Sequence, residues 1–405
     1  MSNNSNTFLK WVHTITPGLI TAALVFGPSK LTITSKLGAL YGYDMLWIVA
    51  VAIFFMAVFA AIATRIGAAA DVSLLQIVRR KWGKTPALAL GVGVFLVSTS
   101  FQAGNSIGVG IALGELTGTS PKPWLLGCTA IAIGLLFFRK FYSVLEKTMI
   151  TLILLMLFSF ITVFVLSQPS PVSIAKGFVI PSIPDGALGL LIAFVASCFS
   201  IVGALYQSYL IQERVRLNPA LKNAKNDSLT GTLLLGVMSA IVIICAAAVL
   251  NPKGLTVNSG SDMAKALEPI FGHNASTLFL IGLFGAAFSS LIGNASVGGT
   301  LLSDAMGYGS SFGSKSVRLA TALVMVVGAG VALSFGGLPL ELIVFAQSVT
   351  IFVVPFIGIA MYIVSNDKSI MGDKVNTPFY KIAGLAGLIL IITLALINIK
   401  ELFLK

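Results

Sequence analysis

Long apolar segments alternate with short polar segments along almost the whole chain. A helix needs about 20 mainly apolar residues to cross the hydrocarbon core of a bilayer. Eleven stretches have this character: residues 16–40, 45–66, 86–116, 124–138, 148–166, 187–210, 229–250, 275–302, 319–335, 340–364 and 382–397. The pattern therefore predicts an all-α membrane protein with about 11 transmembrane helices.

The composition supports this prediction. Of 405 residues, 57% are hydrophobic and 10% are charged, and the mean hydropathy is +0.97. This leaves too little polar surface to cover a soluble globule of this size, so lipid must be the solvent. The lipid bilayer is accordingly the expected surrounding of the chain.

The formal net charge of +12 is explained by the loops. In a soluble protein this charge would suggest nucleic acid as a partner. Here most of the 26 lysines and arginines fall in alternate loops, which are then cytoplasmic because inward-facing loops carry the excess of positive charge. These residues are Lys10, Arg65, Arg79, Arg80, Lys81, Lys84, Arg139, Lys140, Lys147, Arg214, Arg216, Lys222, Lys225, Lys315, Arg318, Lys368, Lys374 and Lys381. We expect no nucleic-acid partner, a cell-membrane location, a cytoplasmic N-terminus and an external C-terminus.

Side chains that would suggest an enzyme or a structural metal site are scarce. Cys128, Cys198 and Cys245 stand singly within apolar segments, and His13 and His273 lack ligand neighbours at metal-binding spacing. No phosphate-binding glycine loop or nucleophile elbow is present in the sequence. We therefore expect no enzymatic activity, no bound metal and no cofactor.

A helix breaker stands in the middle of the first span. Residues 16–26 and 31–40 read as two half-helices, separated by Gly27, Pro28, Ser29 and Lys30. Proline removes a backbone donor, and glycine accepts conformations that other residues resist. Irregular backbone at membrane depth is tolerated only where it is buried in protein or lines a cavity. The break is thus the first candidate for a substrate site.

The sixth span contains a weaker counterpart, with Ser197, Ser200 and Gly203 in a run of small residues. Corresponding breaks in the first and sixth spans are typical of two five-helix halves with inverted topology, as in LeuT-like transporters. This organisation would give one transmembrane domain over residues 1–405. Its first repeat would cover about 16–166 and its second about 187–364, followed by an extra helix at about 382–397.

Several segments resemble the Nramp (natural resistance-associated macrophage protein) family of transporters. The similarity is most specific in the loop after the tenth span and continues through most of the chain. The matching segments are residues 41–47, 107–113, 275–279, 346–348, 354–356 and 365–376. The resemblance implies the inverted-repeat fold with discontinuous helices 1 and 6, and transport by alternating access.

The residues with which that family holds metal differ here. Its first-helix motif Asp-Pro-Gly-Asn aligns with Gly27, Pro28, Ser29 and Lys30, so only the proline remains. On the sixth helix, Ser200, Ile201 and Val202 stand at the places of its Met-Pro-His, and Gln207 stands at a second histidine. In the third helix, Gln102 and Asn105 replace acids linked to proton movement. These departures weaken the expectation of metal transport and of proton coupling by that route.

Lys30 changes the electrostatic potential expected at the site from negative to positive. A divalent cation ~4 Å from its ammonium would be repelled by roughly 8 kcal/mol at an effective dielectric constant of 20. A small anion would be attracted, and the start of the following half-helix would add free amides. An alternative is that Lys30 extends to an aqueous vestibule, or loses its proton on burial, and only blocks the old metal position.

We therefore expect a secondary transporter of a small inorganic or organic ion, with an anion such as bicarbonate or a small carboxylate as the main hypothesis. The expected substrate-binding residues are Gly27, Pro28, Ser29, Lys30, Ser197, Ser200, Gly203 and Gln207, and the expected translocation route includes Thr32, Thr34, Gln102 and Asn105. One alternative is a divalent cation transporter for magnesium or manganese with an atypical site. Another is a membrane sensor that has lost transport.

Overall fold

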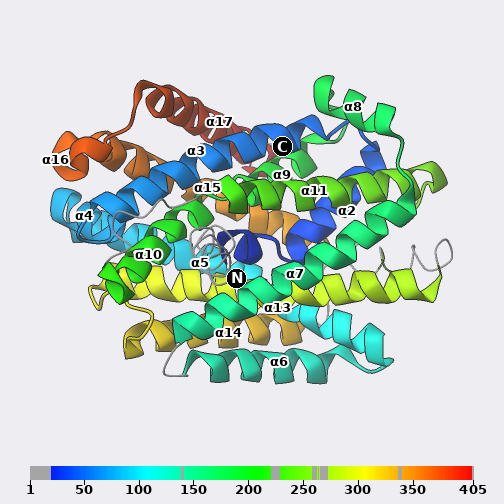
Figure 1. Cartoon of the computed structure of the whole chain (residues 1–405), viewed down its shortest axis with the longest axis horizontal. Coiled ribbons are helices and arrows are strands. Elements are labelled where there is room, and N and C mark those ends of the chain that lie inside the picture. The colour runs from blue at the N-terminus through cyan, green and yellow to red at the C-terminus, as the bar shows by residue number, and fades with distance from the viewer. Residues whose placement is uncertain are drawn as a thin grey trace, which may run out of the picture.

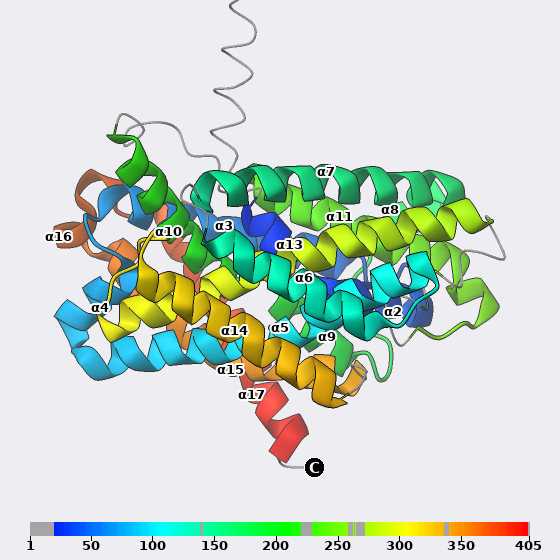
Figure 2. The same cartoon turned by 90° about the horizontal axis from the view of Figure 1, so that it is seen from below.

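The computed structural model describes residues 20–137, 141–219, 229–257, 262, 264, 272–335 and 340–403. These residues fold into helices joined by short connections, and no strand occurs among them. Figure 1 shows most of the long helices running along the longest axis of the molecule, and Figure 2 shows the same bundle from below.

Each of the 11 predicted spans coincides with a helix or a pair of helices. After a short helical segment at residues 20–25, the order is α2 Pro28–Tyr41, α3 Trp47–Ala69, α4 Leu74–Trp82, α5 Lys84–Thr117, α6 Pro121–Leu136, α7 Phe141–Ser167, α8 Pro171–Val179, α9 Leu188–Cys198, α10 Ile201–Leu217, α11 Leu229–Val249, α13 His273–Met306, α14 Lys315–Phe335, α15 Leu340–Asn366, α16 Lys368–Met371 and α17 Pro378–Phe403. In this part of the chain, seven helices are long and apolar enough to cross a membrane, or up to nine if two bent pairs are counted. The all-α prediction is confirmed, while the number of 11 crossings stays a prediction.

Three short helices were not predicted, because none has the length or apolarity of a span. Ser73 caps α4 by accepting a hydrogen bond from the Gln76 N–H, and the last turn of this helix carries Arg79, Arg80 and Lys81. The α8 helix turns away from α7 by 113°, and α16 turns away from the end of α15 by 69°. Figure 1 shows α4 and α16 at one end of the molecule and α8 at the other.

Contacts between charged groups tie the α4 and α16 end together. Lys81 forms a salt bridge with Asp367, the residue that caps α16. Hydrogen bonds from Lys81 and Ser369 lower the pKa of Asp367 to about 2. The Arg65 guanidinium lies 4.0 Å from the centre of the Tyr380 ring, and Lys374 Nζ donates to the Ala68 carbonyl. The basic residues of several predicted cytoplasmic loops thus gather on one side of the bundle.

Small residues allow the helices to approach one another closely. A Cβ atom added to Gly38 of α2 would lie 2.2 Å from the Ile243 carbonyl oxygen in α11. One added to Gly67 of α3 would lie 2.5 Å from the Ser208 carbonyl oxygen in α10. The backbones at these crossings leave no room for a side chain, which fixes how α2 and α10 sit against their neighbours.

We expect Gly38→Ala to lower the stability of the protein by about 1–3 kcal/mol, the usual cost of overpacking a tight core. Thermal unfolding in detergent would measure the change. Gly127→Ala is the matched control, because an added Cβ at this position in α6 meets nothing within 4 Å. Equal melting temperatures for the two variants would contradict the close approach of α2 and α11.

Candidate functional site

The first span is interrupted at Phe26 and Gly27. The helical segment at residues 20–25 ends there, and α2 begins with Pro28 in its first turn. The sequence placed the break over residues 27–30, so the break is confirmed, but its position needs correction for Ser29 and Lys30. Both residues belong to the first helical turn, because proline is well suited to the first position of a helix and starts α2 at residue 28.

The break releases backbone carbonyls from their helical donors. Pro28 has no N–H, so the Leu24 carbonyl lacks the donor that a continuous helix would give it. The Gly27 N–H bonds to the Val25 carbonyl at 3.1 Å instead of to the Ala23 carbonyl. The Ala23 carbonyl accepts hydrogen bonds from two serines of α13, Ser289 at 3.2 Å and Ser290 at 3.0 Å.

Gly27 is required by the close contacts at the break. A Cβ atom at this position would lie 2.8 Å from Asn105 Oδ1 and 3.0 Å from Ser290 Oγ. Asn105 comes from α5 and Ser290 from α13, so the break is held between these two helices. Any side chain at residue 27 would push the break away from the polar groups that face it.

The sixth span is interrupted at Phe199 and Ser200, between α9 and α10. The Ile201 N–H bonds to the Phe199 carbonyl at 3.0 Å, so the Ser197 carbonyl is released from its regular helical donor. Ser200 caps α10 by accepting a hydrogen bond from the Gly203 N–H at 3.1 Å. The predicted weak break is confirmed, although Ser197 lies in the last turn of α9 and Gly203 in the first turn of α10.

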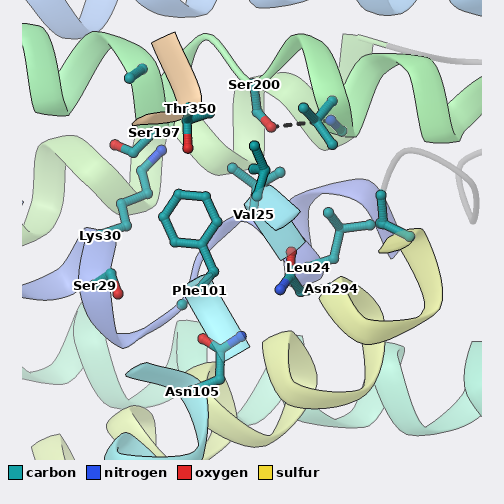
Figure 3. Close-up of a pocket in the computed structure, with 16 residues that line it drawn as sticks. Leu24, Val25, Ser29, Lys30, Phe101, Asn105, Ser197, Ser200, Asn294 and Thr350 are labelled. Atoms are coloured by element: carbon teal, nitrogen blue, oxygen red, sulfur yellow. Dashed lines mark hydrogen bonds between the residues drawn. The ribbon is translucent and has the colours of Figure 1, made fainter. Parts of the chain in front are cut away.

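A small cavity lies between the two breaks. Its volume is about 50 Å³, which is room for a few water molecules. Figure 3 shows side chains from both breaks and from α5, α13 and α15 around it. The lining residues are Leu24, Val25, Gly27, Ser29, Lys30, Val97, Phe101, Asn105, Ala196, Ser197, Ser200, Val202, Gly203, Asn294, Val297 and Thr350.

Lys30 is buried in the wall of this cavity. It is 1% exposed, and no group among the described residues forms a hydrogen bond with its amine. The amine lies 6.0 Å from the centre of the Phe26 ring and 5.9 Å from that of Phe194. Cys198 is the titratable side chain that interacts with the amine electrostatically. In Figure 3 the amine points toward the side of the cavity formed by Ser197 and Thr350. The alternative in which Lys30 reaches an exposed aqueous vestibule does not agree with this burial.

Six of the eight residues expected to bind substrate line the cavity: Gly27, Ser29, Lys30, Ser197, Ser200 and Gly203. The other two do not. Pro28 packs toward Gly108 of α5, where an added Cβ would lie 2.3 Å from the proline Cγ. Gln207 donates a hydrogen bond to Thr64 at 3.1 Å, further along α10.

Of the four residues expected along the route, only Asn105 lines the cavity. Thr32 and Thr34 turn their hydroxyls back onto α2, to the carbonyls of Pro28 and Lys30. Gln102 donates to the Leu291 carbonyl at 3.0 Å and lies against Gly328 of α14. Thr32 and Thr34 therefore bond within their own helix, Gln102 joins α5 to α13, and none of the three lines the cavity.

Sequence reasoning missed several lining residues, including Phe101, Asn294 and Thr350. Phe101 and Val97 precede Asn105 by four and eight residues, so the helical repeat of α5 predicts that they share its face. Asn294 anchors α13 to α5 by donating to the Ser98 carbonyl at 2.7 Å. No sequence signal singles out Asn294 or Thr350 from the many other polar residues in the spans.

The chemistry available to the cavity is neutral apart from one amine. Serine and threonine hydroxyls, the Asn105 amide and the released carbonyls can coordinate a small ion, and Lys30 is the ionisable side chain among the lining residues. Among the described residues there is no group of three or more His, Cys, Asp or Glu side chains placed to hold a metal ion. The donor set thus consists of uncharged oxygen and nitrogen atoms beside an amine.

Comparison with known proteins gives consistent matches over almost the whole chain. The family model for natural resistance-associated macrophage protein-like proteins matches residues 18–401. The divalent metal cation transporter MntH of Chromohalobacter salexigens is 26% identical over 377 residues, which cover 90% of this chain and 86% of the relative. This relative carries the name of a transporter and not of an enzyme.

Solved structures show the same fold. The manganese transporter of Eremococcus coleocola, in complex with an aromatic bis-isothiourea compound, has a TM-score of 0.77 and 19% identity, with 97% of this chain and 87% of that chain covered. Mhp1, a nucleobase-cation-symport-1 family transporter, has a TM-score of 0.57 and 14% identity, with 97% and 94% covered. The expected LeuT-like fold, with interruptions in its first and sixth spans, is confirmed by these neighbours.

The family match covers the interrupted spans, the cavity between them and nearly all of the remaining chain. The chain is therefore a multi-pass membrane transporter and belongs to the natural resistance-associated macrophage protein (Nramp) family.

Proposed function

We propose that this protein is a secondary transporter that carries a small ion across the cell membrane by alternating access. The observation that carries the proposal is the cavity between the two interrupted spans, which is lined by residues at both breaks, by hydroxyl-bearing side chains and by Lys30. Transporters bind substrates at such breaks near the middle of the bilayer, and opening alternates from one side to the other. We further propose that the repeats at about 16–166 and 187–364 are the two halves that move, with the N-terminus cytoplasmic and the C-terminus outside.

A divalent metal cation is the substrate that the comparisons favour. Several relatives bear the name divalent metal cation transporter, and the structural neighbour is a manganese transporter. The comparisons thus support our sequence-based alternative, a divalent cation transporter with an atypical site, better than the main anion hypothesis. Hard cations such as Mg²⁺ and Mn²⁺ accept oxygen ligands and retain bound water. The Leu24 and Ser197 carbonyls, the Ser29 and Ser200 hydroxyls and Asn105 would supply such ligands.

A small anion is the second candidate, and Lys30 is the specific observation in its favour. Its amine is buried in the cavity wall, and no carboxylate among the described residues hydrogen-bonds to it. A protonated amine there repels a divalent cation at ~4 Å by about 2 kcal/mol even at the dielectric constant of water, and by more in the protein. Ser29 and the start of α2 would add hydroxyl and amide donors for an anion.

The Lys30→Met variant distinguishes the two substrates by the sign of its effect. If the substrate is a divalent cation, removing the amine should tighten binding by roughly 30-fold or more, because at least ~2 kcal/mol of repulsion is lost. If the substrate is bicarbonate or a small carboxylate, the same change should abolish binding. Uptake of radioactive manganese and of bicarbonate into proteoliposomes, as a function of concentration, measures both.

Lys36→Met is the matched control, since it removes the same charge from α2 at a residue that does not line the cavity. It should leave both uptake curves unchanged. Saturable manganese uptake that ignores bicarbonate would eliminate the anion candidate, and the converse result would eliminate the cation. Absence of flux for every ion tested would favour a non-transporting sensor and overturn the proposed function.

The break in the first span should be necessary for transport. Pro28→Ala restores an N–H at residue 28, which can then bond to the Leu24 carbonyl and extend the helix across the break. We expect uptake to fall at least tenfold, a loss of about 1.4 kcal/mol, while thermal stability is kept or increased. Pro86→Ala is the control, because Pro86 lies in the first turn of α5, where the helix has no such interruption. Normal uptake by Pro28→Ala would show that the released carbonyl is not used.

A further inference from the structure

A buried carboxylate at the end of α13 connects three helices. Asp304 is 1% exposed. Its Oδ2 atom accepts hydrogen bonds from Ser73 Oγ at 2.5 Å and from the Tyr209 hydroxyl at 2.8 Å, and its Oδ1 atom accepts one from Gln76 Nε2 at 3.1 Å. All three donors are neutral, and no salt bridge to Asp304 occurs among the described residues. Asp304 lies in the last turn of α13, which ends at Met306.

These hydrogen bonds attach α10, the second half of the sixth span, to α4 and α13. Ser73 and Gln76 belong to the start of α4, and Tyr209 lies in the middle of α10. The Gln212 amide adds a bond of 2.8 Å to the Val72 carbonyl, so α10 is also attached to the connection between α3 and α4. Because α9 and α10 are separated at Ser200, α10 is free to move relative to α9 once these bonds are released.

The hydrogen bonds of Asp304 lie between the candidate site and a larger pocket. A pocket of about 440 Å³ is lined by Ser73, Gln76 and Tyr209, together with Asp71, Glu213 and the segment around Tyr308. On α13, Asn294 and Val297 line the central cavity, and Asp304 follows Val297 by seven residues, two turns along the same face. Movement of α10 away from α13 would therefore join the cavity to the pocket.

Several charged side chains lie on the elements that surround Asp304. Basic side chains outnumber acidic ones on the elements packed against this end of α13, and the Arg79 guanidinium is close enough that a Cβ on Gly307 would lie 2.4 Å from its Nη1 atom. The titratable groups on these elements are Asp71, Arg79, Arg80, Lys81, Lys84, Tyr209, Glu213, Arg214, Arg216, Tyr308, Lys315 and Arg318.

We propose that Asp304 is a proton-binding site that keeps the inner gate of this transporter closed through its hydrogen bonds to α4 and α10. In its ionised form, the carboxylate accepts all three hydrogen bonds and holds α4 and α10 against α13. A proton from the pocket that binds to Oδ2 turns this atom into a donor, so it no longer accepts from both Ser73 and Tyr209. Release of Tyr209 lets α10 swing away and opens the cavity to the pocket. This inference rests on the alternating access proposed above.

The gate can be measured without transport. Spin labels at Leu217→Cys and Met306→Cys, both exposed positions at the ends of α10 and α13, report the distance across the pocket. The background is Cys128→Ala, Cys198→Ala and Cys245→Ala in the full chain. For the otherwise unchanged protein, pulsed electron spin resonance should show a longer distance that is more populated at acidic pH than at neutral pH.

Asp304→Asn should populate the longer distance at both pH values, because an amide presents one acceptor oxygen and no charge. Tyr209→Phe should raise the open-to-closed ratio by roughly tenfold, the effect expected for removing a hydrogen bond to a charged group, while keeping its dependence on pH. Tyr308→Phe is the matched control, since this exposed tyrosine lines the same pocket and should behave like the unchanged protein.

Identical distance distributions for Asp304→Asn and the unchanged protein at both pH values would overturn the proposal. If Asp304→Asn fails to fold, the Tyr209→Phe variant provides the test. An unchanged open-to-closed ratio in Tyr209→Phe would then reject the proposed role of Asp304. Failure of the proposed function has a different signature, because the distance would still respond to pH while no ion is taken up by proteoliposomes.

Discussion

The structure depends on the need of every buried backbone N–H and C=O group for a partner. Within a bilayer there is no water to supply one, so a span interrupted in the middle is stable only where other groups replace the lost hydrogen bonds. Ser289 and Ser290 do this for the Ala23 carbonyl, and Ser200 does it for the start of α10. Leu24 and Ser197, whose carbonyls lose their regular helical donors, are among the residues that line the cavity.

The same constraint explains why polar residues in the spans serve two purposes. Asn294 and Gln102 bind carbonyls on neighbouring helices, and Thr32 and Thr34 bind carbonyls of their own helix, so these side chains stabilise the bundle. Lys30 is different, since its buried amine lacks a hydrogen-bond partner among the described residues. A buried group of this kind is costly, and this one lies in the wall of the cavity.

Two buried ionisable side chains, Lys30 and Asp304, lie in different parts of the bundle. Lys30 is the ionisable side chain of the cavity wall, whereas Asp304 accepts hydrogen bonds that join α13 to α4 and α10. The relatives are named divalent metal cation transporters, and an amine at Lys30 would repel such a cation if it were protonated.

The sequence by itself determined the membrane environment, the positions of the long helices, the break at Gly27 and Pro28, and the unusual amine of Lys30. These follow from local properties, namely the length of apolar runs, the missing N–H of proline and the identity of one side chain. Only the tertiary structure decided which polar residues face the cavity, why Gln207 and Gln102 do not, and that Asp304 is buried against Tyr209. Those facts depend on contacts between residues far apart in the chain, and helical periodicity constrains the face of each helix but not its partner.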